Sequence, residues 1–96
     1  MSFLIPVQRL RDTPTLVAFY HPQPSYPVHI LIVPKRAISN LLAIGPADQP
    51  FLADLFRCVR ELVLELQLDK QGYRLIANGG NFQEIPQLHF HLISES

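Results

Sequence analysis

The sequence has little of several things that would mark a specialised class of protein. It has one cysteine, no tryptophan, four glycines and no excess of either charge. A single cysteine, Cys58, excludes an internal disulfide and a Cys-x-x-Cys zinc knuckle, and it fits a reducing compartment. No apolar run approaches the roughly 20 residues that cross a bilayer, so we expect no membrane partner and a cytoplasmic location.

Charge is balanced, with eight lysines and arginines against eight acidic residues. Without a net positive field or a basic patch, the chain lacks the electrostatic means to gather phosphate backbones, and we expect no nucleic-acid partner. Residues 1–7 are apolar, but they have no basic leader and include Pro6, so they predict an edge strand rather than a signal peptide.

The order of the predicted elements indicates an α+β fold. Ninety-six residues with 48% hydrophobic content predict one compact domain over residues 1–96. Apolar runs and turn signals predict strands over 3–11, 15–20 and 28–33, a helix over 48–68, and strands over 73–77 and 88–94. We therefore expect a mostly antiparallel sheet of about five strands, covered on one face by the long helix.

The helix has the longest regular pattern in the chain. Its apolar residues recur at i, i+3/i+4 and i+7, with Asp48 as a candidate N-cap and Gly72 just beyond the end. The stripe comprises Phe51, Leu52, Leu55, Phe56, Val59, Leu62, Val63 and Leu66. We expect it to face the core, and its width makes it a candidate dimer surface as well.

Residues 87–93 place two histidines on one face of an otherwise apolar strand. Strict alternation sends Leu88, Phe90 and Leu92 to one face. Gln87, His89 and His91 point to the other face, with neighbouring side chains about 6.5–7 Å apart. One face can pack in the core while the other meets a ligand.

A third imidazole has a route to the same place. His29 is the one polar member of the apolar strand 28–33, and pairing of that strand with 88–94 would bring His29, His89 and His91 together beside the turn Asn78-Gly79-Gly80. Exposed amides of such a turn suit an anion, so the group indicates a phosphate site. Two other interpretations are open: a zinc site with His29 or His21 as third ligand, and a hydrogen-bonded core pair without function.

Two separate segments resemble the histidine triad family of nucleotidyl hydrolases and transferases, and the resemblance covers most of the chain. The family signature, His-Φ-His-Φ-His-Φ-Φ with Φ apolar, is similar to residues 87–93, with Gln87 in place of the first histidine. A family histidine in an apolar strand that ends in Pro-Lys is similar to residues 29–35. Residues 86–91 are closer still to a bacterial subgroup with Pro-Gln-Leu-His-x-His at this place.

The resemblance implies a mechanism without cofactor or metal. His89 would attack the α-phosphate of a nucleotide, and water would then release a nucleoside monophosphate from the nucleotidyl-histidine. His91 and His29 would hold the nonbridging oxygens. The substrate-binding residues would be Asn78, Gly79, Gln83, Glu84, Gln87, Phe19, Tyr20 and His21. The backbone carbonyl of Gln87 would hold the second ring nitrogen of His89, a task that any side chain at that position permits.

The implied substrates are a diadenosine polyphosphate or an adenosine phosphoramidate, and the implied assembly is a homodimer through the helix 48–68 and the sheet edge. Three positions depart from the family pattern: Gln87, Glu84 where a hydroxyl residue is common, and His21 where an aspartate often binds the ribose. These departures, with a short C-terminus, motivate an alternative, namely a catalytically weak nucleotide-binding or scaffolding member of the same fold.

Overall fold

The computed structural model describes residues 8–95, which form five strands and one long helix. The strands are β1 (Arg9–Asp12), β2 (Leu16–Tyr20), β3 (Val28–Pro34), β4 (Arg74–Ile76) and β5 (Phe90–Ser94), and the helix is α1 (Gln49–Glu65). Short 3-10 turns are η1 (Leu41–Ala43), η2 (Pro46–Asp48), η3 (Leu68–Lys70) and η4 (Gly80–Phe82). The edge strand expected in residues 1–7 lies outside the described residues.

The five strands form one sheet in the order β1-β2-β3-β5-β4, and every neighbouring pair is antiparallel. This confirms the predicted α+β fold. The pairing of β3 with β5, on which the convergence of the histidines depends, is also confirmed.

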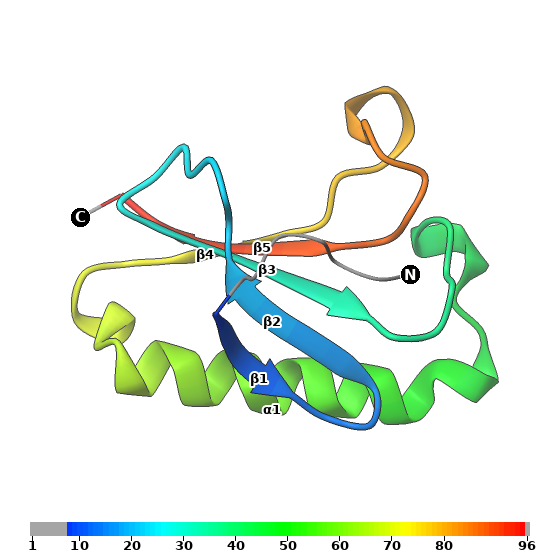
Figure 1. Ribbon diagram of the computed structural model, residues 1–96, viewed down its shortest axis with the longest axis horizontal. Coiled ribbons are helices and arrows are strands. Elements are labelled where there is room, and N and C mark those ends of the chain that lie inside the picture. The colour runs from blue at the N-terminus through cyan, green and yellow to red at the C-terminus, as the bar shows by residue number, and fades with distance from the viewer. Residues whose placement is uncertain (1–7, 96) are drawn as a thin grey trace.

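The two faces of the sheet have different roles, because residues paired across antiparallel strands point to the same side. One face packs under α1 and carries much of the core, namely Leu16, Ala18, Ile30, Ile32, Phe90 and Leu92. The opposite face carries Phe19, His29, Leu31, His91 and Ile93, and is here called the histidine face. Figure 1 shows α1 along one side of the sheet, while the loop after β2 and the loop between β4 and β5 rise on the other.

Helix α1 is shorter than predicted. It covers 17 residues and ends at Glu65, because Gln67 adopts a left-handed backbone conformation with φ of 57° and the chain then turns through η3. Asp48 does occupy the N-cap position, but its side chain makes no capping bond. The buried carboxylate instead accepts hydrogen bonds from Arg36 and from the backbone N–H of Gly45, which tie the preceding loop to the helix start.

Polar contacts fasten the β1–β2 hairpin to one flank of α1. The Thr15 hydroxyl donates to Asp54 at 2.7 Å, and the Arg11 guanidinium pairs with Glu61 at 3.2 Å and with Glu65. Within the part of the chain that the structure describes, no helix is long and apolar enough to span a bilayer.

Strand β5 begins at Phe90, two residues later than predicted, and β4 is limited to Arg74–Ile76. Leu88 lies before the ladder, and its backbone N–H donates to the carbonyl of Ile38 at 2.7 Å. The alternation nevertheless persists through the segment, since Leu88, Phe90 and Leu92 are buried while His89 and His91 are only partly covered.

Candidate active site

The sheet register brings the histidines together. Leu31 of β3 pairs with His91 of β5, and His29 pairs with Ile93, so the two histidines are diagonal neighbours on the histidine face. The backbone N–H of His21 donates to the carbonyl of His29 at 2.8 Å, so the pairing of the chain with β3 continues one residue beyond the end of β2. His89 follows on the other side of His91, with ring centroids 5.0 Å apart. All four histidines of the chain therefore form one cluster.

His89 has a defined tautomer. Its Nδ1 lies 2.8 Å from the backbone carbonyl oxygen of Gln87. A carbonyl can only accept, so Nδ1 carries the hydrogen and Nε2 keeps a free electron pair. The contact expected at position 87 is therefore present, and it uses the backbone of Gln87 rather than its side chain.

His29 is buried, with 5% of its surface exposed, and both its ring nitrogens are used. The backbone N–H of Ser25 donates to His29 Nδ1 at 3.1 Å, so the neutral ring carries its hydrogen on Nε2. That Nε2–H donates to Nδ1 of His91 at 2.9 Å. His29 has no ring nitrogen left for a phosphate oxygen. The structure thus corrects the expected role of His29: it orients His91 rather than holding the substrate.

His91 is the end of this chain of hydrogen bonds. Because its Nδ1 accepts from His29, the neutral ring presents an Nε2–H, and no partner for that group is found among residues 8–95. Burial, followed by repulsion from His89, His29 and His21, lowers the pKa of His91 to about 4. The neutral ring is therefore the stable form near pH 7, and its N–H is free to donate to an anion.

The neighbours of His29 lower its pKa as well. Burial is the larger cause, and the charge of His21 is the second. No carboxylate or Lys/Arg side chain contributes to the shifts of His29 or His91. The cluster is built of imidazoles alone, so a bound anion would be its first opposite charge.

A pocket of about 220 Å³ opens beside the His29–His91 pair. Asn78, a predicted site residue, lines it together with Ser25, Tyr26, Ile76 and Ile93. The last four were missed by sequence reasoning. Ile93 could have been found, since it lies two residues after His91 on the same face. Ser25 and Tyr26 belong to a proline-rich loop whose path has no sequence signal, and Tyr26 meets the His29 ring edge-on at 5.4 Å.

Other predicted residues lie in the loop between β4 and β5. Gly79 is extended and Gly80 has a φ of 57°, which gives the turn expected there. The side-chain amide of Gln83 donates to the carbonyl oxygens of Ser39 and Ile85, so its N–H groups hold the loop against the segment after β3. Glu84 is exposed and does not contribute to the pKa of His29 or His91.

The two aromatic residues at the end of β2 face opposite ways. Phe19 pairs with Leu31 and belongs to the histidine face. Tyr20 pairs with the core residue Ile30, so it points to the helix side, and the structure does not bring it to the histidines. The structure therefore does not bring Tyr20 to the site, and the contact of Phe19 with a base stays a prediction.

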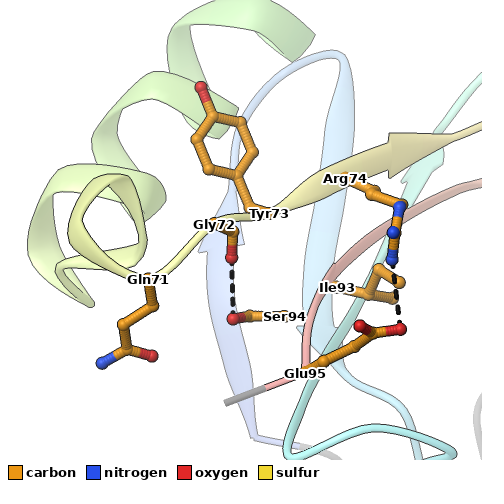
Figure 2. A pocket seen from close by; sticks show the side chains of 7 residues that line it. All are labelled: Gln71, Gly72, Tyr73, Arg74, Ile93, Ser94 and Glu95. Atoms are coloured by element: carbon orange, nitrogen blue, oxygen red, sulfur yellow. Dashed lines mark hydrogen bonds and ion pairs between the residues drawn. The ribbon is translucent and has the colours of Figure 1, made fainter.

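A second pocket, of about 250 Å³, lies at the far end of β5. Figure 2 shows that Arg74 and Glu95 form an ion pair there, while Tyr73 and Gln71 point away from it. The Ser94 hydroxyl donates to the carbonyl of Gly72 at 2.8 Å. Because the Arg74 guanidinium is already paired with Glu95, this pocket is less suited to binding an anion than the histidine cluster is.

The geometry of a metal site is not found in the described residues: no group of three or more histidine, cysteine, aspartate or glutamate side chains is placed to hold an ion. The hydrogen bonds explain this, because the ring nitrogens of His29 face Ser25 and His91 instead of a common centre.

Comparison with known proteins agrees with this picture. The HIT domain family matches residues 3–96. An uncharacterized HIT-like protein of Helicobacter pylori is 32% identical over 92 residues, which cover 94% of this chain and 86% of that protein.

Solved structures have the same fold. A HIT family hydrolase from Legionella pneumophila superposes with a TM-score of 0.86 at 29% identity, covering 96% of this chain and 84% of the other. A histidine triad nucleotide-binding protein from Candida albicans has a TM-score of 0.83 at 31% identity, covering 96% and 68%. The fold is thus the one that HIT family hydrolases adopt.

Proposed function

Because the chain belongs to the HIT domain family, we propose that it is a nucleotide hydrolase that cleaves at the α-phosphate of a dinucleoside polyphosphate or a nucleoside phosphoramidate. The observation that carries this proposal is the hydrogen bond between His89 Nδ1 and the Gln87 carbonyl. It leaves Nε2 of His89 as a nucleophile beside the outward N–H of His91.

The reaction has two steps. The electron pair of His89 Nε2 forms a bond to the α-phosphorus, the bond from phosphorus to the leaving oxygen or nitrogen breaks, and the leaving group takes up a proton from solvent. Water then attacks the same phosphorus and gives up a proton to solvent, the bond between phosphorus and His89 Nε2 breaks, and a nucleoside monophosphate departs. The Gln87 carbonyl stabilises the Nδ1–H of His89 while the ring carries positive charge in the intermediate.

Binding of the phosphate uses the neutral ring of His91. Its Nε2–H donates to a nonbridging oxygen while its Nδ1 still accepts the hydrogen bond from His29. Asn78 lines the pocket beside His29 and His91, and it would hold another oxygen of the same group.

The test is chromatographic detection of AMP released from adenosine phosphoramidate and from diadenosine tetraphosphate. We expect release from at least one substrate, and a loss of more than about a thousandfold in His89→Ala with the fold retained. Gln23→Ala is a suitable control, because Gln23 is exposed and contacts the cluster through its backbone N–H only. Binding of AMP without release from either substrate would contradict the enzyme and favour a nucleotide-binding member.

We also propose that two copies pair through α1 and the outer edge of β4. Among the described residues β4 pairs with β5 alone, and Phe56 on α1 and Tyr73 just before β4 are exposed apolar side chains. An outer strand favours the addition of another strand.

A further inference from the structure

His21 is part of the cluster but has no role in the chemistry described so far. Its ring centroid lies 4.4 Å from that of His29 and 6.4 Å from that of His91. The three rings form a triangle in which His29 is buried, whereas His21 and His91 both reach the surface. A ligand that contacts His91 therefore has His21 as a neighbour.

The hydrogen bonds determine what His21 can offer. The backbone N–H of Gln23 donates to Nδ1 of His21 at 3.0 Å, so the neutral ring carries its hydrogen on Nε2. No partner for this Nε2–H is found among the described side chains and backbone groups. His21 thus presents a second N–H donor beside that of His91.

The surroundings of His21 favour an anionic partner. The titratable groups in ring contact with His21 are His29 from β3 and His91 from β5. Tyr26 from the loop meets His29 in turn. Positive charge on His21 opposes positive charge on His29 and His91. No carboxylate is found among the contacts of His21, His29 and His91 in the described residues. A bound phosphate would supply the negative charge that the cluster lacks.

We propose that His21 binds a second phosphoryl group of the nucleotide, next to the phosphorus that His89 attacks, and so selects substrates with two phosphates over those with one. The inference rests on the proposed function, which it refines. An N–H donor binds a phosphate dianion more strongly than it binds a neutral sugar hydroxyl. The second phosphate belongs either to the 5′ chain or to the ribose.

Binding measurements on the His89→Ala background test this without turnover. Isothermal titration with AMP, ADP and adenosine 3′,5′-bisphosphate at pH 6.5 gives the gain in affinity from each second phosphate. We expect either ADP or the 3′,5′-bisphosphate to bind about tenfold more tightly than AMP. This gain should fall below about twofold when His21→Ala is added. ADP places the second phosphate on the 5′ chain, and the 3′,5′-bisphosphate places it on the ribose.

Two further variants test the N–H donor of His21. His21→Gln keeps an N–H donor without the imidazole ring, so part of the gain should remain. Gln23→Ala should keep the full gain, because only its backbone contacts His21. A gain in affinity that survives His21→Ala would overturn the proposal. So would the lack of a gain for both ADP and the 3′,5′-bisphosphate.

The proposed function has a separate readout, the release of AMP from adenosine phosphoramidate, which has a single phosphorus. Release together with no gain from a second phosphate would refute the role of His21 and leave the hydrolase intact. A gain that depends on His21, together with no release from any substrate, would refute turnover and keep His21 as a phosphate-binding residue.

Discussion

At the residue scale, the direction of each hydrogen bond decides what each imidazole can do. The Gln87 carbonyl leaves Nε2 of His89 with the free electron pair that the proposed nucleophile needs, and the Ser25 N–H makes His29 a donor to His91. The positions of His29, His89 and His91 on one face could be predicted from strand alternation and from the expected pairing of two strands. Their tautomers could not, since they depend on backbone groups of loops that no periodic pattern describes.

We propose that His29 is a positioning residue that acts through His91. In His29→Phe an aromatic ring is kept, but Nδ1 of His91 loses its donor and the tautomer of His91 is free. We expect kcat to fall about tenfold to a hundredfold with a smaller change in KM, and the pH profile of kcat to shift.

Steady-state kinetics from pH 5 to 8 check this prediction. Gln23→Phe is the matched control for the added aromatic ring, since Gln23 is exposed and contacts the cluster through its backbone N–H only, and it should leave kcat and the pH profile unchanged. An unchanged kcat and pH profile in His29→Phe would mean that the donor to His91 is dispensable.

At the element scale, the periodic patterns were predictable and the ends of the elements were not. The i, i+3/i+4 stripe predicts the position of α1. The end of α1 depends on the left-handed backbone of Gln67, and glutamine is not a residue type that indicates this conformation. Likewise β5 starts late because Leu88 bonds to Ile38, a contact 50 residues away in sequence. The prediction for Tyr20 is wrong because Tyr20 follows Phe19 directly, and alternation sends consecutive residues of a strand to opposite faces.

The end of α1 offers a stability prediction. Gln67 has a φ of 57°, a conformation that glycine adopts at little cost. We expect Gln67→Gly to raise the free energy of unfolding by about 0.5–1 kcal/mol, as measured by urea denaturation. Asp69→Gly, in the regular turn η3, is the control and should lower it by about the same amount. A loss of stability in Gln67→Gly would show that its side chain matters more than its backbone.

At the scale of the whole molecule, stability should depend on the cluster. The pKa of His91 is about 4 in the folded chain, below the ordinary value of an unfolded histidine, and burial lowers the pKa of His29 too. Below about pH 6.5 the unfolded chain takes up protons that the folded chain does not. The free energy of unfolding should therefore fall as the pH falls from about 6.5 to 4.

Urea denaturation at pH 7 and pH 5 measures this dependence. The variant His91→Asn should lose part of it, whereas lowered carboxylate pKa values, such as that of Asp48, act mainly at lower pH in both proteins. Equal pH dependence in the two proteins would mean that His91 does not resist protonation in the fold.

The dimer is a second property of the whole molecule. Phe56 lies about 200° around α1 from Asp54, hence on the flank away from the β1–β2 hairpin and towards β4. We expect Phe56→Glu to convert a dimer into a monomer in light scattering after size-exclusion chromatography. Leu42→Glu is the control, since Leu42 is 92% exposed on η1, and it should remain a dimer. A wild-type monomer, or a Phe56→Glu dimer, would contradict the proposed interface.

The central claim is that His89 forms a bond to the substrate phosphorus. Mass spectrometry of the protein quenched during turnover of adenosine phosphoramidate, followed by peptide mapping, tests it most directly. We predict an adenylyl group on His89 that is absent from His89→Ala and present in His91→Asn at lower occupancy. Release of AMP with the adduct on another residue, or with no adduct under conditions that trap phosphohistidine, would contradict the account.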